Sequence, residues 1–199
     1  MVVPFPAYFE SNHIGGIVSP QFLTPPGLAA VLDLATPSLQ FLPFDRAVSA
    51  LQKSNLSSVP VPVTQACHSK TGDPLYFVPV TSTGATDLMG IDTGATNTKF
   101  SEESNIAHAI GSRSERAGHV SESLGGGDKG ERVVRDVRLQ RGGTTVEVNP
   151  SIGKTPASCS VKGQLGMDAL RGCLLVLSHD EVAFGCPRAA ESASSVTGR

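Results

Sequence analysis

The sequence predicts a mostly β protein built from short strands and tight turns, with few short helices. Its 199 residues include 21 Gly and 14 Pro, which interrupt the chain too often for long helices. The apolar residues fall in short runs, and within residues 133–139 they alternate with charged residues as in a half-buried strand. A chain of this length forms one domain or one and a half and can bury a core.

Composition and charge argue against two classes of partner. The formal net charge is −2 and 17% of the residues are charged, which gives no reason to expect a nucleic-acid partner. No run approaches the roughly 18 apolar residues that a membrane helix requires. Residues 1–6 lack the basic start, apolar run and cleavage site of a signal peptide. We therefore expect no nucleic acid and no membrane as partner.

The four cysteines are Cys67, Cys159, Cys173 and Cys186. They form no Cys-x-x-Cys pair and have few histidines at metal-ligand spacing, so we expect no metal and no cofactor. Their even number suggests disulfides, with three possible pairings, and favours a periplasmic or secreted location for a full-length form. Buried free cysteines are the alternative.

The first quarter of the chain predicts a strand and a hairpin. Residues 17–23 form an apolar run that enters a short turn or helix. After a Pro-Pro-Gly break, residues 29–34 and 39–42 predict the two strands of a hairpin. Residues 44–51 suit one or two helical turns, and residues 54–62 are expected to be a linker.

A second region runs from residue 59 to residue 186. Residues 75–80 and 87–91 flank a turn-rich segment and predict a hairpin that ends at Asp92. Residues 101–109 are polar and suit a helix, with Ser101, Glu102 and Glu103 at its start. Further strands are predicted over residues 133–139, 144–148, 173–177 and 182–184, and residues 163–170 precede the last two of them. The small polar tail, residues 187–199, is expected to be disordered.

The end of this region repeats the first quarter of the chain. Residues 17–23 align with residues 164–170, residues 31–33 with residues 176–178, and residues 39–41 with residues 182–184. An internal repeat indicates two copies of one structural unit. Chance similarity between two strand-turn-strand blocks is the alternative.

The motif around which the chain is organised is Asp92-Thr93-Gly94-Ala95, after an apolar run. This pattern suits a strand that delivers Asp92 into a tight turn requiring Gly94. It resembles the Asp-Thr-Gly loop of aspartic proteases, and Ala95 brings it closer to the retropepsin-like form than to pepsin. The resemblance implies that Asp92 is one of two water-activating carboxylates. It also implies that Thr93 hydrogen-bonds across the site and that Gly94 lets the backbone turn.

A second part of the resemblance is Leu165-Gly166. It is similar to the Leu-Gly segment that packs beneath the catalytic loop in retropepsin-like proteases, before the hairpin that closes the lobe. The resemblance implies a retropepsin-like acid-protease β-barrel lobe over residues 59–186, and the remnant of a preceding lobe over residues 1–53. Gly125, Gly126 and Gly127 lie in a predicted hairpin tip suited to a substrate-covering flap. A solvent hairpin without function is the alternative.

The resemblance implies an aspartic endopeptidase acting on polypeptides. That chemistry needs two carboxylates sharing one proton, one acting as base on water and the other polarising the peptide carbonyl. The chain has one Asp-Thr-Gly, and neither Asp87 nor Asp168 lies in a matching loop. The second Asp is therefore expected from a homodimer partner or from a missing N-terminal lobe.

Other interpretations remain open. A catalytically silent lobe would serve as a dimerisation or peptide-binding module. Residues 91–99 also resemble the first phosphate loop of sugar kinases and actin-like ATPases, but the sequence shows no second such loop. If Asp92 has no catalytic role, it is expected to cap a turn. Cys67 and His68 could form a catalytic Cys–His pair, but the sequence shows no third residue to orient the histidine.

Overall fold

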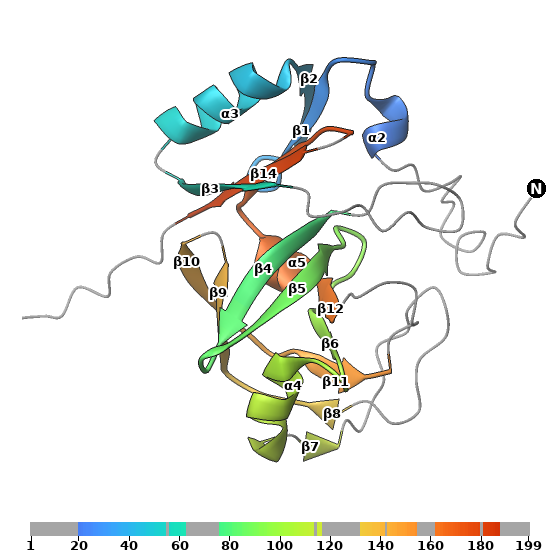
Figure 1. Ribbon diagram of the computed structural model, residues 1–199, viewed down its shortest axis with the longest axis vertical. Helices are drawn as coiled ribbons and strands as arrows, with labels where there is room; N and C mark the ends of the chain where they lie inside the picture. Colours follow the sequence, from blue (N-terminus) through green and yellow to red (C-terminus); the bar gives the residue numbers. More distant parts are fainter. Residues whose placement is uncertain are drawn as a thin grey trace, which may run out of the picture.

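The computed structural model describes residues 20–54, 56–62, 76–113, 115–116, 132–141, 143–154, 162–179 and 181–187. It is mostly β, with a curled half-barrel sheet, a smaller sheet and a few short helices, as the sequence predicts. In Figure 1 the five-stranded sheet lies above the nine-stranded curled sheet. None of the helices within the described ranges is long and apolar enough to cross a membrane.

The smaller sheet combines strands from distant parts of the sequence in the order β2-β1-β13-β14-β3. Its strands are β1 (Ala29–Asp33), β2 (Ser38–Leu42), β3 (Ser57–Pro62), β13 (Leu174–Leu177) and β14 (Glu181–Cys186). The predicted hairpins over residues 29–42 and 173–184 are therefore both present, and they share one sheet.

The segment expected to be a linker, residues 54–62, instead contains strand β3. It pairs antiparallel with β14 along its whole length, from Ser57↔Cys186 to Pro62↔Glu181. The prediction was wrong because Pro60 and Pro62 suggested a break in regular structure. Proline is tolerated in an edge strand, where a missing N–H disrupts no ladder, and β3 is the last strand of this sheet.

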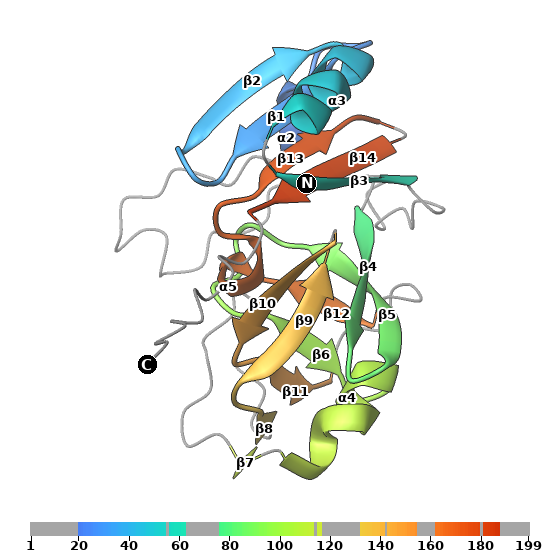
Figure 2. The same ribbon diagram turned by 90° about the vertical axis from the view of Figure 1, so that its left-hand side faces the viewer.

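The two faces of the smaller sheet are covered differently. Helix α3 (Phe44–Lys53) covers the outer face, where Ala47 and Leu51 pack with Val31, Val176 and Ala183. The inner face carries the side chains that alternate with these along β13 and β14. They join the main core of the protein: Leu175, Leu177, Val182 and Phe184. Figure 2 shows α3 on the side of this sheet away from the nine-stranded sheet.

The nine-stranded sheet has the order β10-β9-β4-β5-β12-β6-β11-β8-β7. Its strands are β4 (Phe77–Ser82), β5 (Ala85–Ile91), β6 (Lys99–Ser101), β7 (Glu115–Arg116), β8 (Arg132–Val133), β9 (Val137–Arg141), β10 (Thr144–Val148), β11 (Ser151–Gly153) and β12 (Gly163–Leu165). Most neighbours are antiparallel, but β12 is parallel to β5 and β11 is parallel to β6. Fully buried Phe100, Met89 and Leu165 are among the largest side chains of its core.

Helix α4 (Asn105–Ile110) begins three residues later than a start after Ser101 would place it, and it continues into a 3-10 turn, η1 (Gly111–Arg113). Ser104 is its N-cap and accepts a hydrogen bond from the Ala107 N–H at 2.7 Å. The buried carboxylate of Asp87 also accepts the backbone N–H groups of Asn105 and Ile106. Asp87 is thus a structural anchor between β5 and α4.

The structure contains one of the disulfides that the four cysteines could form. Cys173 and Cys186 form a disulfide across the β13–β14 hairpin, with the Cα atoms 4.2 Å apart. Buried Arg141 donates a hydrogen bond from Nη1 to Cys173 Sγ at 2.9 Å. The free-cysteine alternative is wrong for this pair, whereas Cys67 and Cys159 lie outside the described residues.

The sequence repeat corresponds to matching elements. Helix α2 (Pro20–Leu23) aligns with helix α5 (Met167–Leu170), β1 with β13, and β2 with β14. The two hairpins lie side by side because β1 pairs antiparallel with β13. The aligned residues Val31 and Val176 are direct partners in this register. A half-turn about an axis between them exchanges the two hairpins.

Candidate functional site

Asp92 lies where β5 leaves the curled sheet. The last residues of β5 pair with β12 through Gly90↔Gln164 and Ile91↔Leu165. The next N–H, that of Asp92, donates to the Leu165 carbonyl at 3.1 Å. Pairing with β12 therefore fixes the backbone as far as Asp92, and the chain turns immediately afterwards.

The turn is built on the Asp92 side chain itself. Its Oδ1 accepts hydrogen bonds from the N–H groups of Gly94 at 2.9 Å and Ala95 at 3.2 Å. This is the Asx-turn geometry that Asp favours at such positions. Asp92 is half-buried, whereas Thr93 and Gly94 are exposed. Among the described residues nothing donates to Oδ2, so this oxygen remains available to a water or a partner.

The segment after β12 fastens the loop from below. The N–H groups of Met167 and Asp168 donate to the carbonyls of Ala95 and Thr96, at 2.8 and 3.1 Å. Thr98 Oγ1 accepts from the Gly166 N–H and donates to Asp168 Oδ1 at 2.7 Å. Asp168 therefore orients the underside of the loop, which explains a carboxylate at this position without a catalytic role.

Gly166 lets the two segments approach this closely. A Cβ built on it would lie 2.5 Å from the carbonyl carbon of Asn97 and 2.6 Å from its oxygen. Its backbone angles, φ −89° and ψ −178°, are open to any residue. The requirement for glycine here is thus steric and comes from the loop above. The structure therefore brings Leu165-Gly166 and Asp92-Thr93-Gly94 together.

Other predicted features do not join this site. The flap glycines Gly125, Gly126 and Gly127, like Cys67 and His68, lie outside the described residues. Asp87 is occupied by α4, so it offers no second carboxylate to Asp92. No cluster of three or more His, Cys, Asp or Glu side chains suited to a metal occurs in the part of the chain that the structure describes.

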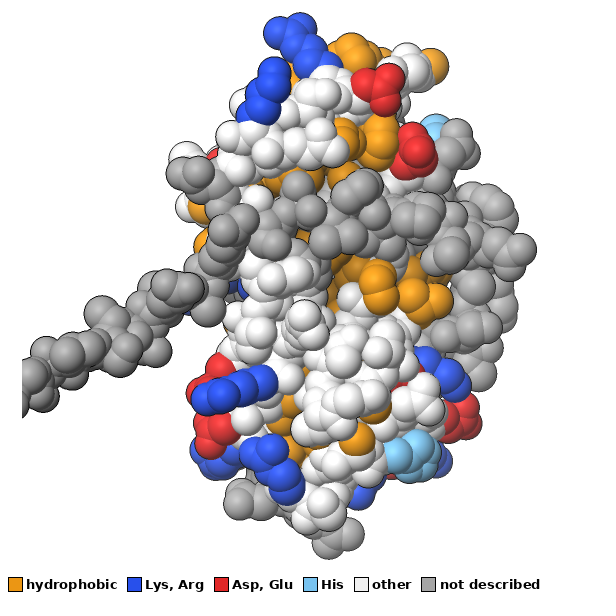
Figure 3. Space-filling view, turned by 60° about the vertical axis from the view of Figure 1, so that its left-hand side comes forward, with side chains coloured by type: hydrophobic (Ala, Val, Ile, Leu, Met, Phe, Trp, Pro, Cys, Tyr) orange, Lys and Arg blue, Asp and Glu red, His pale blue; other side chains and the backbone are white. Residues whose placement is uncertain are grey.

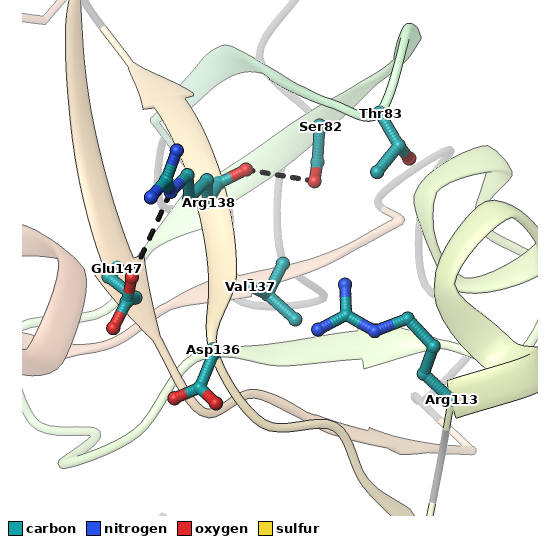
Figure 4. Close-up of a pocket in the computed structure, with 7 residues that line it drawn as sticks. All are labelled: Ser82, Thr83, Arg113, Asp136, Val137, Arg138 and Glu147. Carbon is teal, nitrogen blue, oxygen red and sulfur yellow. Dashed lines mark hydrogen bonds and ion pairs between the residues drawn. The ribbon is translucent and has the colours of Figure 1, made fainter.

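Sequence reasoning did not single out a cavity of about 380 Å³ at the other end of β5. The residues that line it are shown in Figure 4: Ser82, Thr83, Arg113, Asp136, Val137, Arg138 and Glu147. β5 has seven residues and spans roughly 20 Å, which separates this cavity from Asp92. Its exposed ion pair, Arg138 with Glu147 at 3.9 Å, contributes little. No nucleophile–base pair lines it, so Asp92 remains the better candidate site.

Two residues at this cavity have a positive φ angle although neither is glycine. Thr83 has φ 49° and precedes Gly84 at φ 82°, which is the geometry of a two-residue type I′ hairpin between β4 and β5. Asp136 has φ 53°, and its N–H donates to Asn149 Oδ1 at 2.9 Å. The conformation of Thr83 is explained by the hairpin turn, and that of Asp136 accompanies its hydrogen bond to Asn149, so neither requires a ligand.

Comparison with known proteins adds no family assignment. No protein-family model matches this chain, and no curated protein matches it.

Proposed function

We propose that this chain provides one half of an aspartic endopeptidase site, with Asp92 as its catalytic carboxylate. The supporting observation is the Asp92-Thr93-Gly94 loop at the end of β5, fastened to Leu165–Asp168 by five hydrogen bonds. A rigid, preorganised carboxylate on the rim of a β lobe is what water activation requires. The residues 59–186 then form a retropepsin-like lobe, and residues 1–53 belong to a preceding one.

In this proposal Asp92 shares one proton with a second aspartate from another lobe or chain. Two adjacent carboxylates cannot both ionise, so one accepts a proton from the attacking water while the other polarises the peptide carbonyl. The pair titrates as a unit. Thr93 and Gly94 are exposed on the same loop, where Thr93 contacts the opposite half of the site and Gly94 permits the turn.

The proposed substrate is an unfolded or extended polypeptide. The Cys173–Cys186 disulfide favours an oxidising compartment for the full-length form, periplasmic or extracellular. No cofactor is needed for this chemistry, because the nucleophile is water and both catalytic groups are side chains.

The test is peptidase activity on an unfolded protein between mildly acid and neutral pH. Asp92→Asn should abolish the activity, by about 100-fold or more, because an amide cannot act as the base. The matched control is Asp136→Asn, an exposed Asp at positive φ, a conformation that Asn tolerates. Equal activity of wild type and Asp92→Asn would reject the proposal.

A second candidate is a catalytically silent lobe that binds another polypeptide. It is favoured by the single Asp-Thr-Gly loop and by the exposure of Leu23 and Leu39, at 51% and 41%. A well-folded chain without peptidase activity in the presence of a docked second lobe would support this function instead.

A further inference from the structure

The guanidinium of Arg141 is buried at the junction between the two sheets. Arg141 is the last residue of β9 and is only 4% exposed. In Figure 2 this end of β9 points toward the smaller sheet. On the face drawn in Figure 3, charged side chains gather toward the two ends of the molecule, and few show at the junction between the sheets. A charge buried at such a position needs a compensating partner.

The partner that Arg141 has is a neutral sulfur. Within the described ranges, the one hydrogen bond found for the guanidinium runs from Nη1 to Cys173 Sγ at 2.9 Å, and Nε is buried without a partner. Neither of the two ion pairs found in those ranges includes Arg141. Burial lowers the pKa of Arg141 to about 10, so the side chain is still charged at neutral pH. Because a disulfide sulfur is only a weak acceptor, this charge is poorly compensated in the oxidised protein.

Reduction of the disulfide changes what faces Arg141. The sulfur of Cys173 then becomes a thiol, which can ionise. Its thiolate is the anion that Arg141 lacks, and a charge-assisted hydrogen bond replaces a weak one. The guanidinium is already desolvated in the oxidised protein, so the new ion pair does not add that cost again. Arg141 therefore stabilises the reduced protein relative to the oxidised protein.

The disulfide lies at the open end of the β13–β14 hairpin. The strands pair inward from Leu174↔Gly185, and Cys173 and Cys186 are the next residues outward on each side. Cys186 is also the last residue of β14. Both cysteines are fully buried, but the ends of strands open more readily than their centres. A thiol can therefore reach the disulfide when this end of the hairpin opens.

We propose that Cys173–Cys186 is a thiol–disulfide exchange site, which a dithiol reduces reversibly, and that Arg141 favours its reduced form. The co-reactant is a dithiol because its second thiol completes the reduction without a further molecule. The proposal does not rest on the proposed peptidase function, since no step of it involves Asp92.

The exchange proceeds in two steps. A thiolate of the dithiol attacks Cys186 Sγ, the bond to Cys173 Sγ breaks, and its electron pair leaves with Cys173 as a thiolate beside Arg141. The second thiol of the dithiol loses its proton and attacks the dithiol sulfur bound to Cys186, which releases Cys186 as a thiolate that takes up a proton. The protein disulfide gains two electrons, the dithiol becomes a cyclic disulfide, and one proton passes to the solvent.

Reduction removes the covalent link at the end of β14 that also pairs with the edge strand β3. The last two pairs there are Gly185↔Ser58 and Cys186↔Ser57. Gly185 is closely packed, because a Cβ on it would lie 2.7 Å from Cδ1 of Leu51 in α3. Exchange at the disulfide therefore controls how firmly β14 is held between β13 and β3.

The test is the redox equilibrium of the full chain with dithiothreitol, measured anaerobically at neutral pH. Alkylation followed by peptide mass spectrometry counts the free thiols of Cys173 and Cys186 separately from the other cysteines. Arg141→Met should lower the equilibrium constant for reduction by about 100-fold, which corresponds to about 60 mV. Arg138→Met is the matched control, because it removes the same charge from the same strand at an exposed position. It should change the constant by less than about threefold.

A second measurement reports the thiolate itself. At neutral pH the reduced wild type should show the ultraviolet absorbance of a thiolate, and both Cys173→Ala and Arg141→Met should lose it. An unchanged equilibrium constant in Arg141→Met would overturn the proposal. So would the absence of thiolate absorbance in the reduced wild type, which decides the question even if Arg141→Met does not fold. Asp92→Asn should leave both measurements unchanged, so they remain valid if the protein has no peptidase activity.

Discussion

The β1–β2 and β13–β14 hairpins have the same local pattern and different surroundings. Each follows a one-turn helix, and each presents an apolar face toward the same side of the sheet. The face of β13–β14 is buried by the curled sheet, and the face of β1–β2 is partly exposed. Local sequence therefore determines that a hairpin forms, whereas packing against the curled sheet determines how much the hairpin contributes to stability.

The supporting interactions are also unequal. β13–β14 has a disulfide, a contact from the buried Arg141, and a helix fastened to the Asp92 loop. At the positions aligned with Cys173 and Cys186, the first copy has Leu28 and Pro43. The second hairpin thus has stabilising contacts that the first lacks, and four experiments measure how much each of them adds.

The largest difference is expected at the two aligned phenylalanines. Phe184→Ala should cost about 3–5 kcal/mol, because it leaves a cavity in a fully buried core. Phe41→Ala should cost about 1 kcal/mol, because that side chain is only half-buried. Urea denaturation of both variants measures the difference. Equal losses would contradict the unequal burial on which the comparison rests.

The disulfide should contribute the next largest effect. The double variant Cys173→Ala, Cys186→Ala releases a loop of 13 residues, which corresponds to about 3 kcal/mol of lost stability in the chain-entropy account. Because the bond lies across β13–β14 alone, hydrogen exchange should quicken there more than in β2. Uniform acceleration over both hairpins would show that they unfold as one unit. The unchanged chain under oxidising conditions is the reference.

The contact between α5 and the Asp92 loop can be tested at Gly166. Gly166→Ala should destabilise the protein by about 1–3 kcal/mol and lower peptidase activity, since Asn97 must move away from the new methyl group. Gly111→Ala is the control, because a Cβ there has nothing within 4 Å. In the first repeat the aligned residue is Ser19. A stable, active Gly166→Ala variant would show that the loop tolerates displacement.

Much of this arrangement was predictable from the sequence because it depends on local pattern. Apolar runs broken by Gly and Pro predicted the two hairpins, and the spacing of the repeat predicted which of their residues correspond. Asp92-Thr93-Gly94 predicted a loop at a strand end from a few residues that are close in sequence. Its support by Leu165-Gly166 was implied only by the resemblance, because it joins segments that are distant along the chain.

The rest depends on contacts between distant segments. The sequence predicts a linker at β3, because prolines at a free sheet edge and prolines in a loop look the same in sequence. The antiparallel pairing of β1 with β13 joins residues far apart along the chain, and no periodicity reveals it. The disulfide between Cys173 and Cys186 lies across the β13–β14 hairpin, and the sequence left three possible pairings of the four cysteines.

The smallest effect is expected at Arg141, whose guanidinium is buried beside Cys173 with Nε lacking a partner in the described structure. Burial lowers the pKa of Arg141 from its ordinary value to about 10. Because the folded protein holds this proton less tightly than the unfolded chain, the buried charge opposes folding below pH 10. That penalty decreases as the pH rises above about 10, because the folded protein then loses the proton before the unfolded chain does.

Arg141→Met should therefore lower the free energy of unfolding by less than about 1 kcal/mol, or raise it. The reason is that a well-packed apolar side chain replaces a charge with an unpaired nitrogen. The difference between wild type and variant in urea denaturation should stay constant from pH 6 to about pH 9, where Arg141 is protonated in both states. A loss of several kcal/mol would show instead that the contact from Arg141 to Cys173 is a principal support of β13–β14. The difference in stability between the two hairpins would then come from this one charged side chain as much as from packing against the curled sheet.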